Sequence, residues 1–229
     1  MKRPVTPTDL TRIPLFSELD PRDLEPVAAG ARTVSAEKGE TVVEAGAAHR
    51  WFYWVRQGQI RLSVSTASAE EKVVMLVSPG QTFGEALLFT GRPYPVSAVA
   101  LSRATLVAIP HQPVLRLAEE VPGFALRMAG GLARRLHELV ADVESYALHS
   151  GTERVLTYLA GLAPAGAAVP ARPVRVRLPA DKGTIASRLS LKPETLSRIL
   201  RRLADEGVLV VSGRDITLLK EPDPGGGLL

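Results

Sequence analysis

Residues 184–203 read TIASRLSLKPETLSRILRRL, and this stretch decides the fold of the last third of the chain. It predicts two short helices joined by a tight turn, the first of them ending at Ser190. Pro193 suits the first turn of the second helix, where the backbone N–H groups are unpaired in any case, and Gly207 suits a left-handed cap at its end. One apolar stripe is predicted on the second helix by residues that recur at i, i+3, i+4 and i+7, namely Leu196, Ile199, Leu200 and Leu203.

Another face of this second helix is polar and carries the candidate base-reading residues Glu194, Ser197 and Arg198. A helix that buries one stripe and projects such side chains from another face is suited to reading base edges in the major groove. Taken alone, these positions favour a merely solvated helix face, because short motifs often arise by chance. The turn, the caps and a β-hairpin expected over residues 208–219 reverse that preference and predict a winged helix-turn-helix.

The motif Glu194-x-x-Ser197-Arg198 resembles the recognition-helix signature of the CRP/FNR superfamily, which holds the cyclic-AMP receptor protein and the fumarate–nitrate reductase regulator. The longer run LKPETLSRI, residues 191–199, looks most like the nitric-oxide-responsive, denitrification-regulator branch of that superfamily. The resemblance implies a homodimeric transcription regulator, in most cases an activator, that binds double-stranded DNA at TTGA-type inverted repeats. It also implies RNA polymerase as a partner.

The three reading residues suit particular bases. Arg198 presents a planar fork that fits guanine O6 and N7, Glu194 can accept from a cytosine or adenine amine, and Ser197 is short enough to lie against a thymine. This set fits a half-site that contains TGA, and a two-fold dimer requires an inverted repeat of it. Phosphate contacts, which set affinity and salt dependence, are expected from Lys182, Thr184, Lys192, Arg201 and Arg202.

The distribution of charge supports a nucleic-acid partner for the end of the chain. The net charge is +4, and residues 1–149 carry 16 basic and 16 acidic side chains, whereas residues 150–229 carry 12 and 8. A neutral front and a basic back is typical of a DNA-binding domain attached to another domain. The chain has no cysteine, so disulfides and an iron–sulfur cluster are excluded. No apolar run reaches the length of a bilayer span, so we expect a cytoplasmic protein without membrane contact.

Residues 36–112 carry the pattern of many short strands with glycine and proline between them. A short helical lead-in is expected over residues 1–35, with Phe16 packing under the next domain. Strands without intervening helices favour a double-sheet jelly roll and thus an α+β chain, and the segment resembles the cyclic-nucleotide-binding β-roll of the same superfamily. The expected strands are residues 41–44, 51–55, 60–65, 73–77, 97–100 and 105–109.

The effector pocket of this β-roll is expected around Gly84, Glu85 and Ser97. Cyclic-nucleotide-binding relatives pair a Gly-Glu with an Arg-Ser that grips the phosphate, and here Pro95 and Val96 stand where that pair should be. A buried phosphate needs a bidentate cation or several amide donors, so we expect either an effector other than cyclic AMP or no effector at all. A cyclic-nucleotide-responsive regulator stays the alternative, and Glu85 can equally be a structural carboxylate.

The four histidines, at positions 49, 111, 137 and 149, show no metal-ligand spacing. The resemblance to nitric-oxide-responsive members allows a haem with one of them as an axial ligand, but the sequence does not choose among the four. No nucleophile–base pair, metal cluster or paired carboxylates support an enzyme. A β-roll enzyme with an accessory nucleic-acid domain is therefore the least favoured alternative.

A long helix over residues 123–148 is expected to hold the homodimer together. Its apolar residues step by 4, 3, 4 and 3, which is an a/d seam, and they are Leu132, Leu136, Leu139, Val143 and Tyr146. The expected organisation is a sensor domain with its lead-in (1–122), the dimerisation helix and hinge (123–149), the winged helix-turn-helix (150–222) and a disordered tail (223–229).

Overall fold

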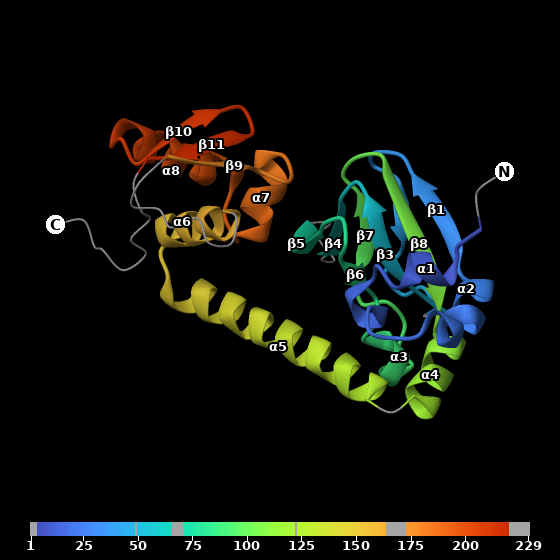
Figure 1. Ribbon diagram of the computed structural model, residues 1–229. Helices are drawn as coiled ribbons and strands as arrows, with labels where there is room; N and C mark the ends of the chain where they lie inside the picture. Colours follow the sequence, from blue (N-terminus) through green and yellow to red (C-terminus); the bar gives the residue numbers. More distant parts are fainter. Residues whose placement is uncertain (1–3, 49, 66–70, 122, 164–172, 220–229) are drawn as a thin grey trace. The chain divides into compact units, whose positions relative to one another are not determined.

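The computed structural model describes residues 4–48, 50–65, 71–121, 123–163 and 173–219. The chain forms two compact units, residues 1–137 and 138–229, and the division falls within one long helix. Histidine 49, most of the loop expected at 163–172 and the expected tail lie outside the described residues. Figure 1 labels the elements of both units.

The first unit contains two four-stranded antiparallel sheets, which confirms the predicted β-roll. One sheet has the order β1-β8-β3-β6, with strands at Arg32–Ala36, Ala104–Pro110, Trp51–Gln57 and Thr82–Phe83. The other has the order β2-β7-β4-β5, with strands at Thr41–Val43, Ser97–Ala100, Ile60–Ser65 and Glu71–Val77. All six predicted strands are present, with ends that differ by a few residues.

Two strands and two helices of this unit were not expected. Strand β1 lies at the end of the predicted lead-in, where its sequence RTVSA has a single large apolar residue and therefore a weak alternation. Strand β6 has only two residues. Helix α3 (Leu87–Thr90) has four residues, and α4 (His111–Glu120) contains a proline, which the first turn of a helix tolerates.

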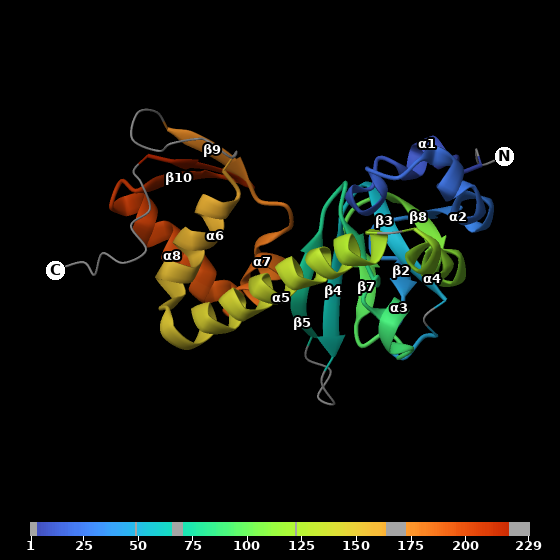
Figure 2. The ribbon, with the colours of Figure 1, turned by 60° about the horizontal axis from the view of Figure 1, so that its bottom comes forward.

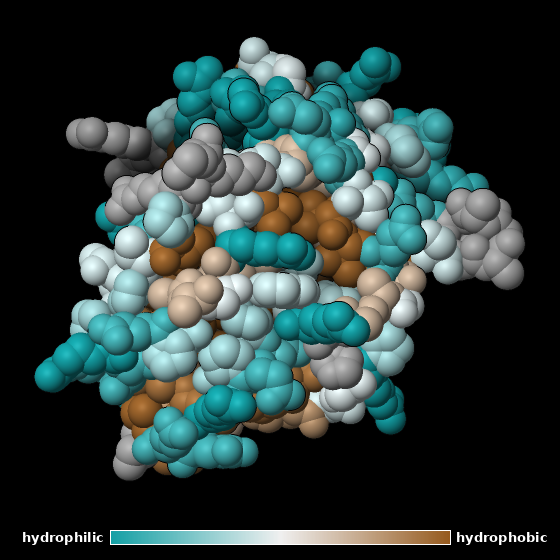
Figure 3. Space-filling model, turned by 90° about the vertical axis from the view of Figure 1, so that its right-hand side faces the viewer, coloured by the Kyte–Doolittle hydropathy of each residue, from teal (hydrophilic) through white to brown (hydrophobic). Residues whose placement is uncertain are grey.

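Helices cover one face of the first unit, as Figures 1 and 2 show for α1, α2 and α4. The lead-in consists of α1 (Pro7–Leu10), two 3-10 turns (Pro14–Phe16 and Pro21–Leu24) and α2 (Glu25–Gly30). Phe16 is fully buried here against Phe52 and Phe124, as predicted for the lead-in. The face seen in Figure 3 is mostly hydrophilic, with hydrophobic side chains exposed near its middle.

Helix α5 (Phe124–Leu148) begins in this core, and its later apolar side chains are not buried by the rest of the chain. Phe124 and Met128 are buried in the first unit. Beyond them the predicted seam is largely open: Leu136, Leu139 and Val143 are 60%, 46% and 66% exposed. Large aliphatic side chains on an exposed helix stripe are the expected appearance of a surface that pairs with another helix.

The second unit is a winged helix-turn-helix, as the sequence predicted. Its helices are α6 (Gly151–Gly161), α7 (Lys182–Arg188) and α8 (Pro193–Asp205). Its sheet has the order β10-β11-β9, with strands at Leu209–Ser212, Asp215–Leu218 and Val174–Arg177. The hairpin of β10 and β11 is the wing.

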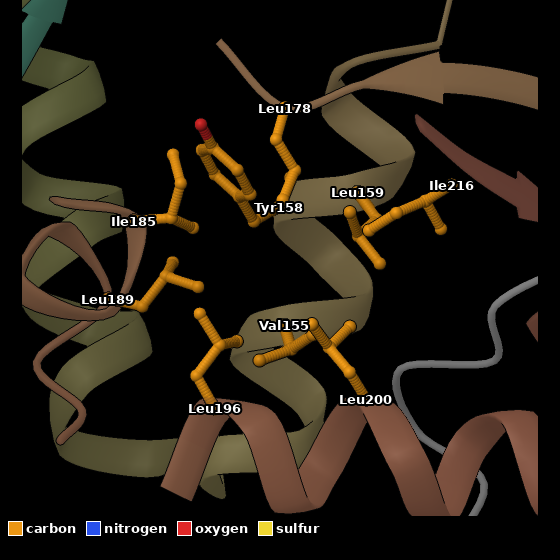
Figure 4. A pocket seen from close by; sticks show the side chains of 9 residues that line it. All are labelled: Val155, Tyr158, Leu159, Leu178, Ile185, Leu189, Leu196, Leu200 and Ile216. Carbon is orange, nitrogen blue, oxygen red and sulfur yellow. The ribbon is translucent and has the colours of Figure 1, made fainter. Parts of the chain in front are cut away.

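The core of the second unit fixes how α8 sits on the other elements. Figure 4 shows side chains from α6, α7, α8 and β11 around one small apolar cavity. Leu196 and Leu200, from the predicted stripe, point into it from α8, and Leu159 of α6 and Ile216 of the wing line it as well. Burying this stripe leaves the opposite face of α8 exposed, because helix faces half a turn apart cannot both be covered by the same core.

Candidate nucleic-acid interface

The exposed face of α8 gathers the residues predicted to read bases. Glu194, Ser197 and Arg198 are all exposed, and they line a shallow depression together with Pro193 and Arg201. At about 100° per residue, Glu194, Ser197, Arg198 and Arg201 fall within about 100° of the helix circumference, opposite the buried stripe. The depression therefore presents an acceptor, a hydroxyl and two guanidinium forks on one surface.

The ends of α8 are formed as the sequence predicted. Pro193 is the first residue of the helix, and Lys192 stands before it in extended conformation. Gly207 has a φ of +66°, the left-handed conformation that glycine adopts without a steric penalty. The turn between α7 and α8 also contains a left-handed residue, Ser190, with a φ of +54°. This non-glycine residue in a sparsely allowed region marks how sharply the chain reverses there.

Thr184 does not reach the DNA-facing surface, contrary to our expectation. It is 8% exposed, and its hydroxyl donates to the Asp181 carboxylate at 2.9 Å. Asp181 is the N-cap of α7 and also accepts the backbone N–H of Thr184 at 2.9 Å. Although partial burial opposes the shift, these hydrogen bonds lower the pKa of Asp181. The Thr184 side chain thus completes a helix cap and is not available to a phosphate.

The other expected phosphate contacts differ in how free they are. Lys192 and Arg201 are exposed, and Lys182 is half-buried at the start of α7. Arg202 is exposed, but its guanidinium donates to the Thr152 hydroxyl of α6 and lies 3.8 Å from Glu206. In this arrangement Arg202 ties α8 to α6, and reaching DNA would require it to leave these partners.

Arg188 joins the last residue of α7 to the end of α5. Its guanidinium lies 2.5 Å from the Asp142 carboxylate and also donates to the Tyr146 hydroxyl. That hydroxyl in turn donates to the Arg188 carbonyl at 2.7 Å, and burial raises the pKa of Tyr146. Tyr146, expected in the dimer seam, is therefore bonded within its own chain, so the exposed seam ends before it.

Arg154 makes a second connection at the same junction. From α6 it donates to the Leu189 carbonyl at 3.1 Å and to the His149 carbonyl at 2.8 Å. These carbonyls lie at the ends of α7 and α5, where helical C=O groups have no partner within the helix. The hinge expected at the end of residues 123–149 thus lies within a hydrogen-bonded junction of three helices.

The expected effector residues lie in the first unit, and their surroundings differ. Gly84 has a φ of +88°, and a side chain there would meet the Tyr94 hydroxyl at 2.6 Å. Tyr94 is buried, and its hydroxyl donates to the Trp51 carbonyl. Ser97 accepts the backbone N–H of Ala45 at 3.0 Å. Glu85 is half-buried, with one carboxylate oxygen enclosed and unpaired among the described residues.

The described histidines lie apart from one another. His111 is 5% exposed and stacks on Phe52 in the core. His137 is exposed on α5 and bonds the Ala133 carbonyl of its own helix, and His149 lies in the other unit. Within the described part of the chain, no group of three His, Asp or Glu side chains could hold a metal ion. The haem that the resemblance allows stays a prediction, and His49 lies outside the described residues.

Comparison with known families agrees with this architecture. Residues 33–121 match the cyclic nucleotide-binding domain, and residues 153–223 match the Crp-like helix-turn-helix domain. The chain is 30% identical over 213 residues to the cyclic AMP receptor protein of Thermus thermophilus. The aligned region covers 91% of this chain and 95% of that protein. The chain belongs to the CRP/FNR superfamily of transcription regulators, as its recognition-helix motif indicated, and its helix-turn-helix is a DNA-binding domain.

Solved structures show the same fold. FixK2 from Bradyrhizobium japonicum is 23% identical, with a TM-score of 0.74 over 85% of this chain and 95% of that chain. DNR from Pseudomonas aeruginosa is 31% identical, with a TM-score of 0.52 over 98% of both chains. No helix among the described residues is long and apolar enough to cross a bilayer.

Proposed function

We propose that the protein is a homodimeric transcription regulator, with activation as its main output through RNA polymerase, and that it binds an inverted repeat with TTGA-type half-sites. The observation that carries this is the shared exposed face of Glu194, Ser197 and Arg198 on α8. The second helix of a helix-turn-helix lies in the major groove with its N-terminal residues at the base edges. Arg198 then faces the guanine of TGA, while Glu194 accepts from an amine of the opposite strand and Ser197 lies against the thymine.

Selection of binding sites from random DNA tests this proposal. The wild type should return a TTGA-containing palindrome. Arg198→Ala should lose about 1–3 kcal/mol per half-site and its preference for the guanine. The matched control, Lys192→Ala, should weaken all sequences alike and lower the salt slope by about one per contact. A wild-type selection without a palindrome, or an Arg198→Ala variant with unchanged preference, would refute the proposed reading face.

The dimer that such a palindrome requires is proposed to form through α5. Leu136, Leu139 and Val143 are open on the described chain, at the a/d spacing of a two-stranded seam. A two-fold pair of chains presents two copies of α8 in the same relation as the two half-sites. The proposed dimer therefore links the exposed stripe of α5 to the inverted repeat.

The effector is proposed not to be cyclic AMP. Pro95 is exposed and has no backbone N–H to offer a phosphate, and Ser97 already holds Ala45. The second candidate, a cyclic-nucleotide-responsive regulator, draws support from the match of residues 33–121 and from the name of the Thermus thermophilus relative. Titration calorimetry with cyclic AMP distinguishes the two, since a micromolar or tighter dissociation constant would establish the second.

A further inference from the structure

The surface depression on α8 includes one residue that sequence reasoning assigned to phosphate contacts. Arg201 lines it together with Glu194, Ser197 and Arg198. Counted at about 100° per residue, Arg201 lies about 20° from Glu194, between Ser197 on one side and Arg198 on the other. Its position is thus the centre of the reading face, directly opposite the buried stripe.

Arg201 is also free to act on a ligand. Its side chain is exposed, and among the described residues no hydrogen bond or ion pair holds its guanidinium. The neighbouring Arg202 provides the contrast, because it lies about 80° from Glu194 at the margin of the reading face and is bonded to Thr152 and Glu206. Two adjacent arginines therefore have different roles available to them.

We propose that Arg201 is a fourth base-reading residue, which recognises a guanine beside the bases read by Glu194, Ser197 and Arg198. The inference rests on the proposed function, because it uses the same helix in the same groove. Arg201 lies seven residues after Glu194, about 10 Å along the helix axis, which is close to the rise of three base pairs at about 3.4 Å each. A long side chain with a guanidinium fork at this point can bind O6 and N7 of one further guanine. Each half-site then extends by one G·C pair.

Two substitutions at this position separate base reading from phosphate binding. Arg201→Ala removes both the charge and the fork, whereas Arg201→Lys keeps the charge and loses only the fork that pairs with guanine. In selections from random DNA, both variants should still return the wild-type core of the palindrome but lose the preference for guanine at one flanking position. In the wild type, replacing that guanine should lower the affinity about tenfold or more. Arg201→Lys should keep the salt slope of the wild type.

Arg202→Ala is the matched control, since it removes the same chemical group one residue away and should leave the base preference unchanged at every position. Thermal unfolding of each variant confirms that the fold is intact. If Arg201→Lys retains the flanking preference, or if the wild type shows none, the inference is wrong and Arg201 binds phosphate. A wild type that selects no palindrome at all would instead refute the proposed function.

Discussion

Removing Arg188 should destabilise the second unit without touching the first. The side chains of Arg188 and Asp142 are only 21% and 31% exposed. Their charge-assisted hydrogen bond is therefore more buried than a surface ion pair and less buried than one in the core. Such bonds contribute about 1.5–3 kcal/mol, against about 0.2–1 kcal/mol for exposed pairs. Arg188→Ala also removes the donor to the Tyr146 hydroxyl. We expect a total loss of about 2–3 kcal/mol.

The two units can be followed separately because both tryptophans of the chain, Trp51 and Trp54, lie in β3 of the first unit. In a unit of this size, 1 kcal/mol corresponds to about 4–8 °C in the unfolding midpoint. Calorimetry of Arg188→Ala should therefore show one transition lowered by about 10 °C or more. The midpoint followed by tryptophan fluorescence should stay where it is.

Two further variants test the reasoning behind this magnitude. Arg175→Ala removes the same group from an exposed position on β9 and should change stability by less than about 0.5 kcal/mol. A double-mutant cycle of Arg188→Ala and Asp142→Ala should give a coupling energy of about 1–2 kcal/mol. If Arg188→Ala behaves like Arg175→Ala, or if the fluorescence midpoint falls equally, the junction does not hold the second unit together.

Two other predictions concern the assembly and the core. Leu136→Asp should yield monomers in sedimentation equilibrium, because the proposed seam would bury an unpaired charge, and Glu144→Gln off the seam should stay dimeric; a dimeric Leu136→Asp places the interface elsewhere. Burial raises the pKa of Tyr158 from 10.0 to about 12, so the folded state holds this proton more tightly. Its contribution to stability is complete below about pH 10 and is lost as the pH rises toward 12. Between pH 9 and pH 11.5, the free energy of unfolding should therefore fall less in Tyr158→Phe than in the wild type.

The apolar pattern of the sequence carried most of the architecture. The apolar stripe predicted both the helix and the side of it that is buried, because residues with this spacing all fall on one face of a helix. The stripe consists of Leu196, Ile199, Leu200 and Leu203. Strand β1 was not predicted, because its edge position leaves it half exposed and removes the apolar–polar alternation that reveals a strand. Helix α4 was not predicted, because a proline in a short segment usually indicates the end of a helix, although the first helical turn accepts it.

Side-chain partners were predictable only where they are local. The cap formed by Asp181 and Thr184 has its signal in the sequence, since Asp stands three residues before a polar residue at the start of an apolar helix. The predicted phosphate contact of Thr184 competes with this cap, in which its hydroxyl and backbone N–H already donate to Asp181. By contrast, Arg188 meets Tyr146 across 42 positions, and only the packing of α5 against α7 brings them together.

The same distinction explains why Arg201 and Arg202 look equivalent in sequence and differ in the fold. A step of one residue turns a helix by about 100°, which moves a side chain from the centre of the reading face to the flank of α6. There the hydroxyl of Thr152 accepts from Arg202, and this bond fixes one arginine as a structural connection. Among the described residues nothing bonds the Arg201 guanidinium, so its five N–H donors stay available on the proposed reading face. If Arg201 reads a base as we propose, the difference between the two arginines comes from the packing between α6 and α8, which bonds Arg202 to Thr152.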